Sequence, residues 1–183
     1  MKKKVSLNTF SNKEYNPGSL ILRLFWYIIN SFLFKSYIFP FSTPKKIILI
    51  LFGAKIGKNF IIRNNVNIKY PWHLTIGDSC WIGEGVWIDN LYKVDIKNNV
   101  CISQGALILS GNHNYKKTSF DLILKPIIIE SGVWVGAKSI ICQGVILNSH
   151  SVICAGSFIN NDTEKYSIYS GNPAKLVRKR TIS

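Results

Sequence analysis

The sequence predicts an all-β solenoid, a parallel β-helix built from six-residue repeats. An aliphatic residue recurs every six positions, with a few gaps: Ile56, Ile62, Ile68, Ile76, Ile82, Ile88, Ile96, Ile102, Ile108, Ile129, Val135, Ile141, Leu147, Ile153 and Ile159. Fourteen of these fifteen residues are β-branched, whereas Ile and Val make up 38 of all 183 residues. Strands alternate with a period of two and helices with a period of 3.6. A period of six instead indicates a short strand followed by a corner, and three such sides close a coil of about 18 residues.

Two further positions of the repeat support this interpretation. The second residue is often small or turn-forming, as in Gly57, Gly77, Gly83, Asp89, Ser103, Gly136 and Asn148. The fifth is usually compact, as in Val66, Cys80, Val86, Val100, Ala106, Val133, Ser139, Val145, Ser151 and Ser157. We therefore expect a solenoid domain at 54–160 whose sides each point an aliphatic and a compact residue into a narrow interior.

Residues 1–53 are expected to form an arm and an apolar helical segment. Residues 1–18 are polar and rich in lysine, which predicts a loosely held arm. Residues 19–34 are apolar nearly all round and predict a helix, which two prolines separate from a second short helix. For that second helix we expect Thr43 as the N-cap and Gly53 as the end.

Two interpretations of this apolar segment are compatible with each other. The helices can cover the open end of the first coil, or residues 1–52 can contact a membrane surface through their aromatic residues and flanking lysines. No stretch reaches the roughly 18 apolar residues that a membrane span needs. We expect a cytoplasmic protein, with any membrane contact at the inner face.

The net charge of +14 lies mainly at the two ends of the chain. Residues 1–60 carry a net +9 and residues 175–180, within a basic tail at 161–183, carry +4. A nucleic-acid-binding protein would line a groove with basic and aromatic residues, so we expect no nucleic-acid partner. The distribution favours a phosphate-bearing ligand at one end and an anionic surface at the other. The four cysteines show no CxxC spacing, which indicates reduced thiols rather than disulfides.

The repeat is interrupted, and its longest interruption carries a histidine. Two-residue slips occur at 74–76 and 94–96, and a long loop at 109–127 separates Ile108 from Ile129. Long loops in compact folds are usually functional. His113 lies where this loop departs, and an imidazole with a near-neutral pKa suits a general base acting on a hydroxyl. We expect substrate contacts from its neighbours and from a polar corner pair, namely Asp89, Asn90, Asn112, Asn114 and Tyr115.

These features resemble the hexapeptide-repeat acyltransferases, and within them the colanic acid biosynthesis acetyltransferases. The resemblance covers nearly the whole chain and rests on the segments 52–57, 66–72, 81–90, 101–105, 111–113, 134–137 and 171–175. It implies that the β-helix is left-handed, which periodicity alone does not settle. It also implies a homotrimer, acetyl-CoA in the groove between neighbouring solenoids, and His113 as the catalytic base.

The same resemblance implies the residues that bind the acetyl donor. Trp134 matches an aromatic residue that lies along the pantetheine arm, and small residues line the groove beside it: Gly136, Ala137, Ala155 and Gly156. Lys175, Arg178 and Arg180 fall in the tail that meets the nucleotide phosphates. The implied reaction is direct O-acetyl transfer from acetyl-CoA to a sugar or glycolipid hydroxyl in cell-surface or exopolysaccharide biosynthesis, without a metal.

Other functions remain open from the residues alone. An amine acceptor would need the same base, so N-acetylation of an amino sugar is the main alternative. A non-catalytic solenoid would need neither the histidine loop nor the basic tail. A zinc-dependent carbonic anhydrase would need three histidines around one metal. The residues His73, His113 and His150 lie in different phases of the repeat, and we expect His73 and His150 to be ordinary surface residues.

Overall fold

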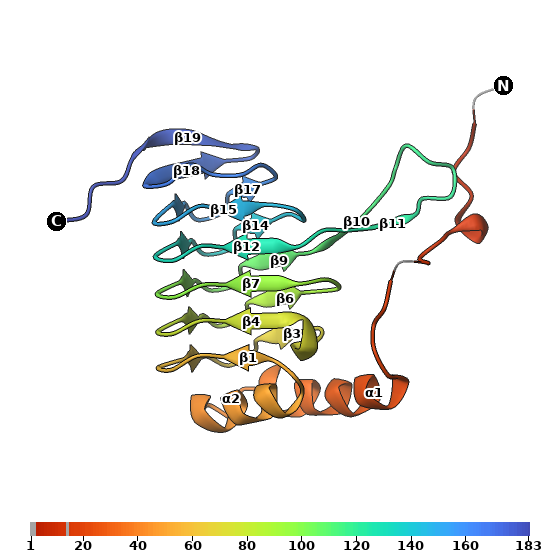
Figure 1. Ribbon diagram of the computed structural model, residues 1–183, viewed down its shortest axis with the longest axis horizontal. Helices are drawn as coiled ribbons and strands as arrows, with labels where there is room; N and C mark the ends of the chain where they lie inside the picture. The colour runs from red at the N-terminus through yellow and green to blue at the C-terminus, as the bar shows by residue number, and fades with distance from the viewer. Residues whose placement is uncertain (1–2, 14) are drawn as a thin grey trace.

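The computed structural model describes residues 3–13 and 15–183, and its centre is a β-solenoid of five complete coils (Figure 1). Each coil has three short strands. They are β1 (Lys55–Ile56), β2 (Ile61–Ile62), β3 (Asn67–Ile68), β4 (Leu74–Ile76), β5 (Trp81–Ile82), β6 (Trp87–Asp89), β7 (Val94–Ile96), β8 (Cys101–Ile102), β9 (Leu107–Leu109), β12 (Ile127–Ile129), β13 (Trp134–Val135), β14 (Ile140–Ile141), β15 (Ile146–Leu147), β16 (Val152–Ile153) and β17 (Phe158–Ile159). The predicted fold class is confirmed.

Strands of successive coils pair in parallel and form three sheets, one for each side of the prism. Sheet A has the order β1-β4-β7-β12-β15, and sheet C has the order β3-β6-β9-β14-β17. Sheet B begins with β2-β5-β8-β13-β16 and continues into the C-terminal strands. The chain therefore passes from A to B to C in every coil, and three edges separate the sheets.

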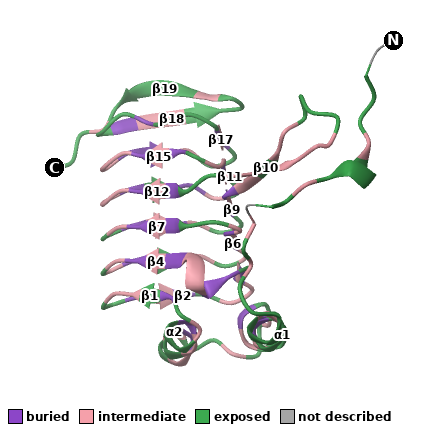
Figure 2. Cartoon of the chain, turned by 45° about the vertical axis from the view of Figure 1, so that its right-hand side comes forward, coloured by how far each residue is buried: buried purple, intermediate pink, exposed green. Residues whose placement is uncertain are grey.

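The interior contains the residues that define the repeat. Fourteen of the fifteen aliphatic first-position residues are at most 2% exposed, and Ile56 in the lowest coil is partly buried. All ten compact fifth-position residues named above are also buried, which includes three serines. Ser139 satisfies its hydroxyl by donating to the carbonyl oxygen of Cys154 at 3.0 Å. In Figure 2 the strands are accordingly purple along the stack, and the corners are pink and green.

The corners explain which residues occupy the second and fourth positions. In all eleven corners without an insertion, the fourth residue has a positive φ: Asn59, Asn65, Ser79, Gly85, Asn99, Gly105, Gly132, Lys138, Gly144, His150 and Gly156. Asn and Gly tolerate this conformation best. The second-position glycines have a different reason, because a Cβ on Gly136 would lie 2.5 Å from the carbonyl oxygen of Ile153 in the next coil.

All three interruptions of the repeat lie at the edge where sheet C passes to sheet A. The first contains the 3-10 turn η3 (Pro71–His73), the second contains residues 90–93, and the third is the long insertion. They are in successive coils, so they stack on one another. The polar groups that the interruptions introduce are thereby gathered along one edge of the prism.

The N-terminal helices cover the open end of the first coil. Helix α1 (Leu20–Ile29) continues into a π-helical turn η2 (Asn30–Phe34), and α2 (Ser42–Leu51) follows. Trp26, Phe34 and Leu49 are buried against the solenoid. The expected N-cap at Thr43 is wrong, because α2 begins at Ser42 and Thr43 lies within the helix. The Ser42 hydroxyl donates to the carbonyl oxygen of Ile62 at 3.1 Å.

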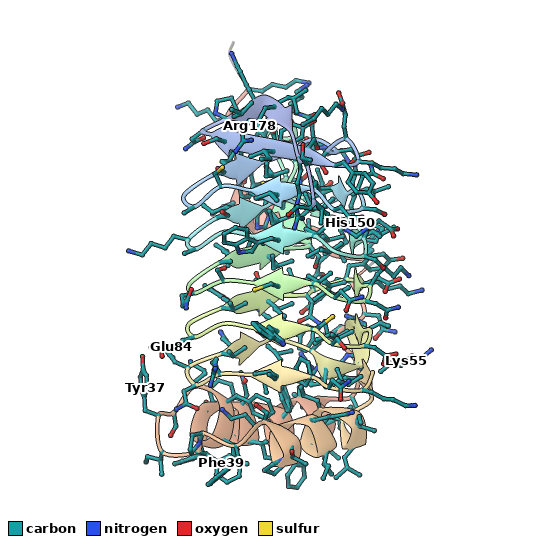
Figure 3. The ribbon with its side chains drawn as sticks, turned by 90° about the vertical axis from the view of Figure 1, so that its left-hand side faces the viewer. Tyr37, Phe39, Lys55, Glu84, His150 and Arg178 are labelled. Carbon is teal, nitrogen blue, oxygen red and sulfur yellow. The ribbon has the colours of Figure 1, made fainter. Side chains whose placement is uncertain are left out.

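The arm and the tail are more ordered than the sequence predicts. The arm holds a short 3-10 turn η1 (Leu7–Thr9) and hydrogen-bonds to the long insertion, so it is not loosely held. The tail forms the antiparallel strands β18 (Ser167–Gly171) and β19 (Ala174–Lys179), and β18 extends sheet B next to β16. Figure 3 shows Phe39 beside the helices and Arg178 at the opposite end of the stack, so the helical segment and the basic tail lie at opposite ends. None of the described helices is long and apolar enough to cross a membrane.

Candidate active site

The long insertion is a β-hairpin that projects His113 from the C–A edge (Figure 1). Strands β10 (Gly111–His113) and β11 (Leu122–Leu124) pair antiparallel, with His113 opposite Leu122. Ser110 fastens the base of the hairpin to the coil before it, because its hydroxyl donates to the carbonyl oxygen of Asp89 and accepts from the amide of Tyr92 at 2.9 Å. The segment expected to be a loop is therefore a β-hairpin, and His113 is the last residue of its first strand.

Two contacts with Phe120 hold the His113 imidazole. Its Nδ1 lies 3.0 Å from the Phe120 carbonyl oxygen, and the two rings stack at 4.5 Å with 7° between their planes. A carbonyl oxygen can only accept, so Nδ1 carries the proton and Nε2 keeps the lone pair that a general base needs. Phe120 itself has φ +50°, a conformation that bulky residues rarely adopt and that strains the backbone.

The N-terminal arm completes the surroundings of the hairpin. The amide of Ser6 donates to the carbonyl oxygen of Thr118 at 2.8 Å, and the Phe10 ring lies 5.8 Å from the His113 ring. Between arm and hairpin is a cavity of about 310 Å³, lined in part by Lys13, Tyr15 and by Asn114, the residue after His113. The cavity therefore lies against the hairpin that carries His113, although His113 itself does not line it.

The expected substrate residues fall into two groups. Asn112, Asn114 and Tyr115 surround His113 on the hairpin, and Tyr115 is 74% exposed. Asn90 is fully buried, and its amide pairs with both backbone groups of Tyr70, accepting at 3.0 Å and donating at 2.6 Å. Asp89 is partly buried and lies 3.4 Å from the Lys69 ammonium. The geometry thus gives Asn90 a structural role at the edge, joining the first two insertions.

The expected cofactor residues lie along a different edge, where sheet B passes to sheet C. Gly136 and Ala137 form this corner in the fourth coil, and Ala155 and Gly156 form it in the fifth, with the Gly156 amide bonded to the Ala137 carbonyl at 2.8 Å. Trp134 precedes the corner of the fourth coil, is 49% exposed, and donates from Nε1 to the Ser103 hydroxyl at 2.8 Å. Together they make a strip of small residues beside an aromatic side chain.

The three tail residues that are expected to meet the phosphates do not lie together. Lys175 is opposite Ser170 near the B–C edge, and Arg178 is opposite Ile168 on the ladder that leads through Val152 to Trp134. Arg180 instead lies at the A–B edge, where its Nη1 donates to the carbonyl oxygens of Gly132 and His150. Arg180 fastens the tail to the coils. Of the three expected residues, Lys175 and Arg178 therefore remain available near the strip of small residues.

Three of the four cysteines are poor nucleophiles in this environment. Burial raises the pKa of the Cys80, Cys101 and Cys142 thiols above their ordinary range. These thiols therefore stay protonated at neutral pH, whereas a nucleophilic cysteine needs a lowered pKa. A covalent acyl intermediate is disfavoured at these three residues.

The three histidines lie apart in the fold, as their phases in the repeat predict. His73 belongs to the first insertion, His113 to the hairpin, and His150 to an A–B corner, where it stacks on Tyr166. His73 is not an ordinary surface residue, because burial lowers its pKa and Nδ1 has no partner among the described residues. In the described part of the chain no three metal-binding side chains gather.

Sequence reasoning missed the residues that orient His113. Phe120 and Phe10 act through contacts that depend on the pairing of the hairpin and on the path of the arm. One signal was available: the short apolar run Leu122-Ile123-Leu124 inside a polar segment suits a second strand.

Comparison with known proteins agrees with this arrangement. A family model described as the hexapeptide repeat of succinyl-transferase matches residues 126–161, the fourth and fifth coils. The "Putative colanic acid biosynthesis acetyltransferase WcaF" of Escherichia coli (strain K12) is 31% identical over 168 residues, which cover 92% of each protein. The chain belongs to the hexapeptide-repeat acetyltransferases. Its insertion, its small-residue corners and its tail are carried by one solenoid.

Solved structures share the fold of this hexapeptide-repeat acetyltransferase. The acetyltransferase VCA0836 from Vibrio cholerae O1 biovar eltor, crystallised with acetyl coenzyme A, matches with a TM-score of 0.80 at 21% identity, covering 91% of this chain and 93% of that one. A maltose O-acetyltransferase from Clostridium difficile 630 matches with a TM-score of 0.79 at 20% identity, covering 90% of both.

Proposed function

We propose that this acetyltransferase moves the acetyl group of acetyl-CoA to a sugar hydroxyl during assembly of a cell-surface polysaccharide. The observation that carries the proposal is the contact between His113 Nδ1 and the Phe120 carbonyl oxygen, which leaves Nε2 as the free base. The 31% identical relative named for colanic acid biosynthesis supports the polysaccharide context. The VCA0836 complex supports acetyl-CoA as the donor.

Transfer is direct in this proposal. Nε2 of His113 takes the proton of the acceptor hydroxyl, and the oxygen attacks the thioester carbonyl carbon. The tetrahedral intermediate collapses with cleavage of the carbon–sulfur bond. The leaving thiolate recovers the proton from the imidazolium, so the products are an acetyl ester and coenzyme A. Asn112, Asn114 and Tyr115 are positioned to bind the acceptor beside the base.

The donor would lie along the B–C edge. Trp134 and the small corners at 136–137 and 155–156 supply an aromatic wall and a narrow floor. Arg178 is three strands from Trp134 on one ladder of sheet B, about 14 Å at the usual strand spacing. The pantetheine arm would follow this ladder, with the phosphates near Lys175 and Arg178.

The separation of the two proposed halves of the site supports a homotrimer. His113 projects from the C–A edge, whereas the groove residues lie along the B–C edge. In a trimer of parallel solenoids, the hairpin of one copy would meet the groove of the next. Acetyl-CoA would then be bound between two copies.

The helical end of the molecule is suited to a peripheral contact with the inner face of a membrane. Fourteen large apolar residues of segment 20–51 are exposed: Leu20, Ile21, Leu22, Leu24, Phe25, Tyr27, Ile28, Phe32, Tyr37, Ile38, Phe41, Ile47, Ile50 and Leu51. Residues 15–77 contain eight Lys or Arg and no Asp or Glu. Cosedimentation of the full chain with anionic vesicles should therefore be salt-sensitive, and equal binding to neutral vesicles would contradict this contact.

The test of the proposed chemistry compares two histidine variants. His113→Ala should lower the rate of acetyl transfer to the acceptor at least about 100-fold. Its circular dichroism spectrum should match that of the wild type, which shows that the fold is retained. His150→Asn is the matched control, because Asn tolerates the φ of +59° at that corner. Free coenzyme A is measured with neutral sugars and amino sugars as acceptors. Transfer that persists in His113→Ala would refute the mechanism, and a product acetylated only on nitrogen would replace O-transfer by N-transfer.

A further inference from the structure

A second cavity, of about 360 Å³, lies between α1 and the lower end of sheet C. Leu20, Arg23 and Leu24 of α1 form one wall, and Asn67, Lys69 and Trp87 of the solenoid form the other. Two hydrogen bonds hold the walls together: Trp26 Nε1 donates to the Ile68 carbonyl oxygen at 2.8 Å, and Asn30 donates to Asn67 at 2.7 Å. The cavity is therefore preformed, as binding sites usually are.

The side chains that line this cavity include three cations. Arg23, Lys35 and Lys69 line it, and no carboxylate is among its lining residues. The Lys69 ammonium lies 3.4 Å from Asp89, so Arg23 and Lys35 are the lining cations without an ion pair among the described residues. The Nε of Arg23 is buried and has no hydrogen-bond partner among the described residues. A buried donor without a partner is costly, so an anionic group that accepts a hydrogen bond from Nε would remove that cost. A phosphate suits a guanidinium and ammonium groups best, since it offers several acceptor oxygens.

The outer rim of the cavity is apolar. Leu20, Leu24 and Tyr27 follow one another at helical spacing along the cavity wall and are all more than half exposed. They are continuous with the exposed apolar residues on the underside of α1, which is green in Figure 2. A ligand that fits both parts has an anionic head and a hydrocarbon chain.

The cavity also opens at the edge that carries the base. Lys69 and Tyr70 are at the C–A corner of the first coil, and Ser110 begins the His113 hairpin at the same corner of the third coil. Two coil spacings of about 4.8 Å separate these levels, roughly 10 Å. A short sugar chain attached to a group in the cavity would extend along this edge toward the hairpin.

We propose that this cavity binds the phosphate or diphosphate group of a lipid, with the hydrocarbon chain lying along the apolar face of α1. Its role in catalysis rests on the proposed function: the lipid would carry the acceptor sugar, so that the acceptor is a lipid-linked saccharide rather than a free one. Binding of the lipid group itself does not depend on that role.

The test is equilibrium binding of farnesyl diphosphate to the full-length protein, with coenzyme A present at saturation so that the donor site is filled. Arg23→Gln/Lys35→Gln should weaken binding about 10-fold or more. Lys97→Gln/Lys165→Gln removes the same charge away from the cavity and should leave binding unchanged. Farnesol and inorganic diphosphate, which each lack one half of the ligand, should bind more weakly than farnesyl diphosphate.

Three results would overturn the proposal. They are equal losses in the two double variants, inorganic diphosphate binding as tightly as farnesyl diphosphate, and weaker binding of farnesyl diphosphate with saturating coenzyme A than without it. If the Arg23 variant fails to fold, Lys35→Gln alone decides, because Lys35 is exposed at the rim. Acetyl transfer by the wild-type protein to both a lipid-linked and a free saccharide, measured in parallel, separates failure of this site from failure of the proposed function, because transfer to either one retains the proposed function.

Discussion

The His113 imidazole receives both its hydrogen-bond acceptor and its stacking partner from Phe120. The strained φ of +50° at Phe120 is what turns its carbonyl oxygen and its ring toward the same histidine. The chain maintains this strain because the hairpin pairing on one side and the arm on the other fix the turn. The backbone strain at Phe120 thus orients the His113 imidazole.

Removing the Phe120 ring should therefore impair turnover without affecting donor binding. Phe120→Asn keeps a residue that tolerates a positive φ but loses the stacked ring, and we expect kcat to fall roughly 10-fold or more. Phe120→Tyr keeps the ring and should stay close to the wild type. Steady-state kinetics should show an unchanged KM for acetyl-CoA in both variants. A kcat for Phe120→Asn equal to that of the wild type would show that stacking does not position the imidazole.

Single residues differ in how far the sequence reveals them. The place of His113 could be predicted because it stands where a regular repeat fails, and such failures are visible along the chain. Its role as a base belongs to the proposed function. Phe120 could not, because its role depends on a pairing across the hairpin. Arg180 was expected near phosphates by its place in the basic tail, yet it bonds two corner carbonyls. Charge alone does not tell whether a cation is already engaged by backbone groups.

At the scale of the repeat element, two positions favour glycine for different physical reasons. A Cβ on Gly83 would lie 2.8 Å from the amide nitrogen of Gln104, so the next coil excludes it. Gly85 has φ +69°, and its nearest neighbouring atoms are 3.7 Å away, so conformation and not space restricts it. The sequence showed the first preference, but the second was hidden because Asn, Ser, Lys and His also occupy the fourth position.

Asparagine substitution should separate these two reasons. Gly85→Asn should leave the urea midpoint near that of the wild type, since Asn tolerates the left-handed region, whereas Gly85→Ala should cost about 1–2 kcal/mol. Gly83→Asn and Gly83→Ala should both destabilise by about 1–3 kcal/mol or more, because any Cβ meets backbone. Urea unfolding monitored by tryptophan fluorescence gives all four values. A stable Gly83→Ala would mean that the coils can separate more easily than their contacts suggest.

The first corner insertion should make stability depend on pH through His73. Burial lowers the pKa of His73, nearby Lys93 lowers it further, and backbone groups of Asn90 and Leu91 act in the opposite direction. The unfolded chain therefore binds a proton more readily than the folded one. This contribution to stability is fully present above the ordinary pKa of 6.5 and is lost as pH falls from there toward the lowered folded-state pKa.

A neutral replacement should flatten that profile. His73→Asn removes the titrating group, so its urea midpoint should fall less than that of the wild type between about pH 7.5 and pH 5.5. Parallel slopes for the two proteins over this interval would show that His73 is not the group responsible.

At the scale of the whole molecule, the repeat predicts the architecture well because each coil restates the same rule. Fifteen aliphatic positions define the three sheets, and errors at single residues do not change their stacking. The ends were predicted less well. The arm, hairpin and tail are held by contacts between segments far apart in sequence, as between Ser6 and Thr118 or Val152 and Ile168. No local periodicity of the sequence predicts such contacts.

His113 and the proposed donor-binding residues lie on different edges, and this placement predicts that neighbouring copies share each site. If neighbouring copies share each site, a chain with His113→Ala and a chain with Ala155→Phe should complement each other. Ala155 is exposed, so the larger side chain would block the groove without disturbing the core. Each variant alone should be inactive, but trimers assembled from an equal mixture should regain roughly a quarter of the sites, those with His113 from one chain and an open groove from the other.

Activity after co-expression of the two variants with different affinity tags gives the measurement. Mixing the separately assembled variants is the control, because intact trimers cannot exchange partners and should stay inactive. If a single chain contained the whole site, the hybrids would remain as inactive as their parents, since every chain carries one defect. Recovery of activity in hybrids would therefore establish that the hairpin of one copy serves the groove of its neighbour.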